Sequence, residues 1–141
     1  MNLLFDASSI AGILSKKRGA AINILVEQST LDLAIYELGN VLWKESRVNK
    51  RTESETSTLV GYIRQVLGVM EMQRVQLDDI LDIELNAVKF ALTFYDASYL
   101  TIAKKCNRIL VTEDKQLQRA SKEANIDCIR AEEVSYPSLK R

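Results

Sequence analysis

Short apolar runs alternate along this chain with longer stretches in which apolar residues recur at helical spacing. The clearest run is Arg108–Thr112, which is apolar, β-branched and followed by polar residues, as expected of a central strand. Further strands are predicted at Leu3–Phe5, Leu31–Ile35 and Ile126–Ile129. A fifth lies near Val69–Val75, where polar positions favour a strand with one wetter face. The pattern therefore predicts four or five short strands.

Helices are predicted between these runs. In the stretch 79–92, apolar residues recur at the 3.6-residue period, at Leu81, Leu85, Val88 and Leu92. The other helical stretches are 19–28, 36–47, 53–68, 96–106 and 114–124. Strands that alternate with helices favour a mostly parallel sheet with helices on both faces, joined by right-handed crossovers. The predicted fold class is therefore α/β.

The length of 141 residues is typical of one domain, which we place at residues 1–131. The remaining residues, 132–141, hold the only proline and are expected to be a tail that is frayed or contacts a partner. The N-terminus has no basic segment and reads as a buried strand, and no apolar run reaches the ~20 residues of a membrane helix. We expect a cytoplasmic protein with reduced cysteines and no membrane partner.

The amino-acid composition restricts the possible reaction chemistry more than it restricts the possible fold. The chain has no histidine, which excludes Ser-His-Asp and Cys-His hydrolases and zinc sites with imidazole ligands. Two cysteines are too few for a thiolate zinc site. The 19 basic residues balance 19 acidic ones, which argues against bulk electrostatic binding of nucleic acid but leaves room for a local basic patch. Carboxylates and hydroxyls remain as the reactive groups.

Four carboxylates fall beside the ends of predicted strands or the starts of helices, where ligands collect in parallel sheets. They are Asp6, Glu37, Asp96 and Asp114. Taken singly, Asp6 and Asp96 are more simply helix N-caps, and Asp114 is a first-turn acid with Thr112 as the cap. The residues alone are compatible with a helix-capping role and with a ligand-binding role for each of these acids.

Glu37 is harder to explain as a surface acid, because it lies in a largely apolar segment with Asn40 on the same helix face. The pattern is compatible with a polar pocket and equally with an exposed edge position. Four acids placed this way together make a site for Mg²⁺ or Mn²⁺, which prefer oxygen ligands. Such an ion lowers the pKa of a bound water and offsets charge on a phosphodiester, so the mechanism requires no histidine.

Four segments in this order resemble the PIN-domain family, and more narrowly the VapC-type toxins of toxin–antitoxin pairs. They are Leu3–Ser8, Glu37–Leu42, Phe94–Ala103 and Leu110–Leu117. The resemblance extends to about Ile129, nearly the whole chain. It implies a three-layer α/β/α sandwich around a parallel sheet of four or five strands, and a ribonuclease that depends on Mg²⁺ or Mn²⁺.

The resemblance also implies a role for each motif residue. The metal-binding acids would be Asp6, Glu37, Asp96 and Asp114. Thr112 would be the hydroxyl that steadies the fourth acid or a metal-bound water, and Ser8 and Asn40 would support the ligands. Members of this kind form homodimers and are silenced by a small antitoxin that occupies the groove of the active site.

This chain departs from the family pattern at two places. A glycine common shortly before the third acid is absent from Thr93–Tyr95, and the acid Glu113 precedes Asp114, so either of these two could be the fourth ligand. The alternatives are a housekeeping RNA-processing or DNA-directed PIN nuclease and a non-catalytic PIN-like scaffold. For RNA contact we expect Lys50 and Arg51 to flank the acidic pocket.

Overall fold

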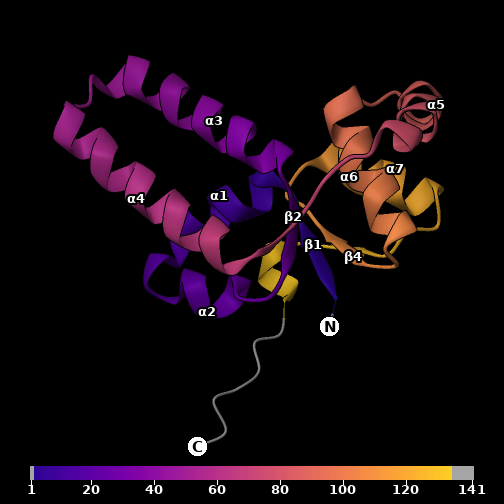
Figure 1. Cartoon of the computed structure of the whole chain (residues 1–141), viewed down its shortest axis with the longest axis horizontal. Coiled ribbons are helices and arrows are strands. Elements are labelled where there is room, and N and C mark those ends of the chain that lie inside the picture. Colours follow the sequence, from indigo (N-terminus) through magenta and orange to yellow (C-terminus); the bar gives the residue numbers. More distant parts are fainter. Residues whose placement is uncertain (1, 135–141) are drawn as a thin grey trace, which may run out of the picture.

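The computed structural model describes residues 2–134, which form one five-stranded sheet (Figure 1). The strand order is β3-β2-β1-β4-β5, and all four pairings are parallel. The strands are β1 (Leu3–Phe5), β2 (Ser29–Leu31), β3 (Glu71–Gln73), β4 (Ile109–Val111) and β5 (Cys128–Ile129). The predicted parallel α/β sheet is confirmed, and its three central strands are β1 and the two strands beside it, β2 and β4.

In the described part of the chain, seven α-helices cover the two faces of this sheet. They are α1 (Ala7–Lys16), α2 (Ala21–Leu25), α3 (Leu33–Asn49), α4 (Glu53–Val69), α5 (Ile80–Phe90), α6 (Phe94–Lys105) and α7 (Lys115–Glu123). Successive residues of β1 point to opposite faces, so Leu3 and Phe5 pack with α1 to α4 while Leu4 packs with α5 to α7. The result is the three-layer sandwich that the sequence predicted.

The second strand begins two residues earlier than the apolar run Leu31–Ile35 predicted. Ser29 and Thr30 are polar but fully buried in β2, and the Thr30 hydroxyl donates a hydrogen bond to the Phe5 carbonyl at 2.8 Å. Leu33 already opens α3. A hydrogen bond across the sheet satisfies the threonine, which an apolar pattern along one strand does not register.

Helix α5 buries a different face from the one its period suggested. Its core residues are Ile83, Ala87 and Phe90. Leu81, Leu85 and Val88 are instead 67%, 57% and 75% exposed. The helix carries apolar residues on two faces, and packing against α6 selects the narrower one. A line of exposed aliphatic side chains remains on its outer side.

Helices α3 and α4 form a long hairpin that extends away from the sheet (Figure 1). Lys50 ends α3 in the left-handed conformation, with φ of 50° and ψ of 50°. The Thr52 side chain then caps α4 by accepting a hydrogen bond from the Glu55 N–H at 3.1 Å. The charged segment between the two helices is therefore an ordered turn.

The packed part of the domain reaches beyond the predicted boundary at residue 131. A short 3₁₀ turn, η3 (Ala131–Glu133), leads to Val134, which is 6% exposed and belongs to the core under β1. The rest of the predicted tail, 135–141, lies outside the described residues. Within residues 2–134, no helix is both long and apolar enough to cross a membrane.

Candidate active site

Asp6 is the most enclosed of the four motif acids. It follows β1 directly and is 4% exposed. Its Oδ1 accepts hydrogen bonds from the Ser9 N–H at 2.9 Å and the Ser8 hydroxyl at 2.8 Å, and its Oδ2 accepts one from the Thr112 hydroxyl. Burial raises the pKa of this carboxyl, and these hydrogen bonds partly offset the rise. Asp6 is thus both the N-cap of α1 and a fixed carboxylate at the sheet edge.

Thr112 connects the carboxyl ends of β1 and β4. It follows β4, is fully buried, and accepts a hydrogen bond from the Asp114 N–H at 3.0 Å while it donates to Asp6. Asp114, and not Thr112, is the N-cap of α7, because its Oδ1 accepts from the Leu117 N–H at 3.0 Å. The expected cap at Thr112 was therefore wrong, and its hydroxyl instead lies between the two acids.

Glu113 and Asp114 occupy different surroundings. The Glu113 side chain accepts a hydrogen bond from the Ala131 N–H at 2.7 Å and lies 3.5 Å from the Arg130 guanidinium. Its backbone N–H donates to the Ser8 hydroxyl at 3.0 Å. The Glu113 carboxylate thus ties the loop after β4 to the C-terminal segment, which leaves Asp114 as the acid of this loop that interacts electrostatically with Asp96.

Asp96 lies in the first turn of α6 but does not cap the helix. The cap is Thr93, whose hydroxyl accepts a hydrogen bond from the Asp96 N–H at 3.1 Å. The prediction that Asp96 is an N-cap was wrong, because its carboxyl does not cap the helix. Burial first, and then the charges of Asp114 and Asp6, raise its pKa to about 6. Asp96 therefore lies within electrostatic range of two other motif acids, Asp114 and Asp6.

Glu37 lies in the second turn of α3 and is half-buried. Its Oε1 accepts a hydrogen bond from the Tyr99 hydroxyl at 2.8 Å. Burial raises the pKa of Glu37, and the charges of Asp96 and Asp6 add to the rise. Asn40 is exposed one turn further along α3, so it does not share the enclosed environment of Glu37 as the sequence suggested.

Electrostatic interactions link the four acids, of which Asp6 and Asp114 follow β1 and β4 while Glu37 and Asp96 lie on α3 and α6. Asp96 interacts with Asp6 and Asp114, and Glu37 interacts with Asp6 and Asp96. Within residues 2–134, however, no three acidic or cysteine side chains are drawn close enough together to form a ligand shell. The donors are all oxygens. Burial raises the pKa of Asp6, Glu37 and Asp96, and like charges add to the rise for Glu37 and Asp96. A hard divalent cation fits this set because it would stabilise the ionised carboxylates.

Comparison with known proteins places this arrangement in a family. No protein-family model matches the chain. Ribonuclease VapC3 of Pyrobaculum aerophilum is 33% identical over 122 residues, which span 83% of this chain and 92% of the relative. The chain belongs to the VapC family of PIN-domain proteins. Exonuclease VapC9 of the same organism is 38% identical over 95 residues, 67% of each chain. The crystal structure of PAE2754 from Pyrobaculum aerophilum superposes with a TM-score of 0.79 at 30% identity, covering 94% of this chain and 92% of that one.

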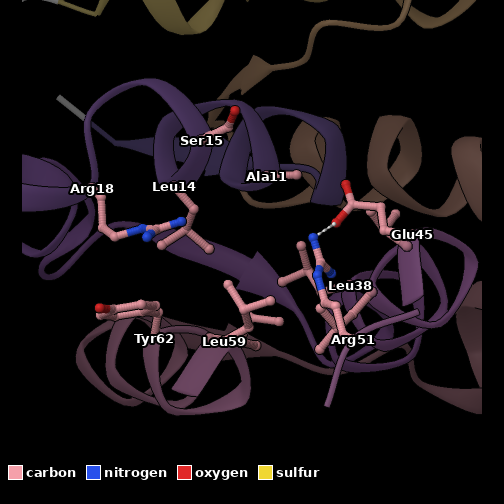
Figure 2. Close-up of a pocket in the computed structure, with 12 residues that line it drawn as sticks. Ala11, Leu14, Ser15, Arg18, Leu38, Glu45, Arg51, Leu59 and Tyr62 are labelled. Atoms are coloured by element: carbon pink, nitrogen blue, oxygen red, sulfur yellow. Dashed lines mark hydrogen bonds and ion pairs between the residues drawn. The ribbon is translucent and has the colours of Figure 1, made fainter. Parts of the chain in front are cut away.

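A cavity of about 260 Å³ lies further along α1 and α3 in this VapC-family chain. Side chains of α1, α3 and α4 converge on it, as Figure 2 shows, and none of the four motif acids lines it. The Arg18 guanidinium lies 4.6 Å from the centre of the Tyr62 ring on one side, and Arg51 pairs with Glu45 at 3.1 Å on the other. This cavity is therefore separate from the acidic group.

The basic pair predicted to flank the acids lies elsewhere. Lys50 is thirteen residues beyond Glu37 at the far end of α3, which at 1.5 Å per residue places it about 20 Å away. Arg51 is turned inward to Glu45, and 17% of its side chain is exposed. The hairpin geometry therefore contradicts the expected position beside the acidic pocket. RNA contact by Lys50 or Arg51 stays a prediction.

Proposed function

We propose that this chain is a metal-dependent endoribonuclease and the toxin of a VapBC-type toxin–antitoxin pair. The observation that carries the proposal is the set of four carboxylates linked by electrostatic interactions, with Asp6 directly after β1, Asp114 in the loop after β4, Glu37 on α3 and Asp96 on α6. The two VapC relatives are named as a ribonuclease and an exonuclease, which supports nuclease chemistry. Hydrolysis without histidine requires another way to activate water, and an all-oxygen cation site supplies one.

Asp6, Asp96 and either Glu37 or Asp114 would hold Mg²⁺ or Mn²⁺. When bound, such an ion lowers the pKa of a coordinated water and offsets negative charge on the phosphate. The protein's own contribution is to hold the ligands in place. Ser8 and Thr112 donate to the two oxygens of Asp6, which fixes the orientation of that carboxylate. Thr112 also anchors the loop that carries Asp114.

The test is cleavage of RNA by the purified protein with Mg²⁺ or Mn²⁺. We expect Asp6→Asn to lower the rate by at least about a hundredfold and EDTA to abolish it, because both remove the ion from the site. Glu113→Gln is the matched control, since that carboxylate is engaged by Ala131 and Arg130. Cleavage that persists in Asp6→Asn or in EDTA would refute the metal-dependent mechanism.

An exonuclease is the second candidate, because one relative carries that name. A circular single-stranded RNA separates the two activities, since it has no end from which an exonuclease can start. We expect the circle to be opened by this protein. An intact circle beside a degraded linear strand of the same sequence would assign the chain to the exonuclease class, and a matched DNA circle tests the DNA-directed alternative.

We further propose that the chain acts in the cytoplasm and is silenced by a small antitoxin protein. Inducing the gene in a bacterial host should arrest growth, and co-expression of the small gene beside it should relieve the arrest. Asp6→Asn should not arrest growth. Normal growth of cells expressing an active nuclease would favour the housekeeping alternative.

A homodimer is proposed through the exposed side of α5. Its aliphatic residues Leu81, Leu85 and Val88 form an apolar line, with Asp82 near one end and Lys89 near the other. Two copies of this helix packed antiparallel across a twofold axis would place Asp82 of each near Lys89 of its partner. Charge and apolar pattern are thus both self-complementary on this face.

A further inference from the structure

Tyr99 joins two helices at the acidic group. It lies on α6, is 1% exposed, and donates its hydroxyl to Glu37 Oε1 at 2.8 Å across 62 residues of sequence. The ring belongs to the core on the α5 to α7 side of the sheet, together with Leu4 and Leu31 of the central strands. Because packing holds the ring in place, the hydroxyl is a fixed donor.

The hydrogen bond is directed at one of the motif acids. The Tyr99 hydroxyl is the donor, because an ionised carboxylate has only acceptor atoms. The bond engages Oε1 and leaves Oε2 of Glu37 without this partner. A half-buried glutamate on a helix surface would otherwise have several side-chain rotamers available to it.

Tyr99 also lies three residues after Asp96 on α6, so the two side chains share one side of the helix. The charges of Glu37 and Asp96 interact, although the two acids come from different helices. The Tyr99 hydroxyl is therefore the direct contact that ties the carboxylate of α3 to the helix that carries Asp96. Ser8 and Thr112 perform the corresponding task for Asp6.

We propose that Tyr99 is a positioning residue, which holds the Glu37 carboxylate against α6, the helix that carries Asp96, so that both acids serve the same divalent cation. This inference rests on the proposed function, because it requires that the acids bind a metal. Partners that orient metal ligands typically affect metal affinity by about 10- to 100-fold. Removal of the hydroxyl should therefore weaken metal binding while the ring keeps the core filled.

The experiment measures Mn²⁺ binding by calorimetry in wild type, Tyr99→Phe, Glu37→Gln and the double variant. We expect Tyr99→Phe to weaken binding by about tenfold. In the double variant we expect no further loss beyond Glu37→Gln, because the tyrosine acts through that carboxylate. Tyr62→Phe is the matched control, since Tyr62 lies in the cavity away from the acids, and it should bind as wild type does.

Cleavage of RNA provides a second readout. Raised Mn²⁺ should restore the activity of Tyr99→Phe, because its acids are all present, and should not restore Asp6→Asn. The ultraviolet difference spectrum on adding Mn²⁺ reports the same contact without altering Tyr99. We expect a tyrosine signal in wild type and in Tyr62→Phe, and none in Glu37→Gln. This measurement decides the matter if Tyr99→Phe does not fold.

Three results would overturn the inference. Affinity of folded Tyr99→Phe within about twofold of wild type would exclude a positioning role, given the usual size of such effects. Independent, multiplicative losses in the double variant would show that Tyr99 acts through something other than Glu37. If wild type binds no Mn²⁺, the proposed function fails and this inference with it. Binding lost in Asp6→Asn but unchanged in Tyr99→Phe overturns only the role of Tyr99.

Discussion

Individual hydroxyl groups hold the acids of this chain in place. Thr112 is the clearest case, because its one hydroxyl donates to Asp6 and accepts from the Asp114 N–H. Ser8 repeats the arrangement, with donation to Asp6 and acceptance from the Glu113 N–H. Both therefore connect the end of β1 to the loop after β4. Removing the Thr112 hydroxyl leaves Asp6 Oδ2 and the Asp114 N–H without these partners inside the protein, which costs more than the loss of a surface contact.

Replacement of Thr112 by valine should lower the free energy of unfolding by about 1–3 kcal/mol, since the Asp114 N–H loses its acceptor and Asp6 loses a donor. Thr112→Ser keeps the hydroxyl and removes one methyl group, so it should cost only about 1 kcal/mol. Urea unfolding monitored by circular dichroism measures both. Equal destabilisation of the two variants would show that packing, and not the hydroxyl, stabilises this position.

Asp96 makes stability depend on pH in a definite direction. Its pKa is about 6 in the folded protein, above the ordinary value for an aspartate of about 4. The folded state therefore holds the proton more tightly than the unfolded chain. Stability from this group is fully present below about pH 4 and is lost as the pH rises to about 6. Burial raises the pKa of Asp6 and Glu37 as well, which adds to the same trend.

We expect Asp96→Asn to flatten this trend in EDTA. Between about pH 4 and pH 6 its melting temperature should fall less than that of wild type, because the asparagine has no proton to lose. At neutral pH, Mn²⁺ should raise the melting temperature of wild type more than that of the variant. Differential scanning calorimetry measures both effects. A steeper pH dependence in the variant would contradict the assignment of the raised pKa to Asp96.

At the scale of elements, the helix ends carry several residues in the left-handed conformation. Asn107 and Asn125, with φ of 52° and 56°, are suited to it, because a short polar side chain tolerates this region. Ala91, which ends α5 with φ of 54°, is not. Here the turn between α5 and α6 imposes a backbone conformation that the residue itself disfavours. That turn leads into the first residues of α6, which include Asp96.

Ala91→Gly should therefore stabilise the protein. The left-handed conformation costs a non-glycine residue about 1–2 kcal/mol, and the greater freedom of glycine in the unfolded chain takes back about 0.5–1 kcal/mol. We expect a net gain of up to about 1 kcal/mol in urea unfolding. Ala11→Gly, in the middle of α1, should instead destabilise. A loss of stability in Ala91→Gly would show that the cap is not strained.

The whole molecule leaves one side of α5 uncovered, and the fold itself explains why. The sheet and α6 engage Ile83, Ala87 and Phe90, so the second apolar line faces outward. An exposed line of aliphatic residues on a small protein is typical of an interaction surface. The twofold pairing proposed for this face buries the line against an identical one.

Light scattering after size-exclusion chromatography should show a dimer for wild type and a monomer for Leu85→Glu, because the new carboxylate would be buried without a partner. Val48→Glu is the control, since Val48 is 81% exposed on α3. That variant should remain dimeric. A monomeric wild type, or a dimeric Leu85→Glu, would place the interface elsewhere or remove it.

The order of the secondary-structure elements along the chain could be predicted from the sequence. The alternation of strands and helices, the parallel sheet and the order of the motif acids Asp6, Glu37, Asp96 and Asp114 follow from periodicity and composition. The missing histidine had already restricted the chemistry to oxygen ligands. These properties depend on residues close together in sequence, which is why a pattern along the chain reveals them.

Tertiary structure alone decided which side chains meet. Tyr99 bonds to Glu37 across 62 residues, and Thr112 reaches Asp6 across 106. Packing against α6 chose Ile83 over Leu85 as the core side of α5, although both are apolar and helical. Lys50 lies at the far end of α3, in the hairpin of α3 and α4, and not beside the acids as the sequence analysis predicted. Periodicity states which residues can be buried, whereas the packing of distant elements determines against what they are buried.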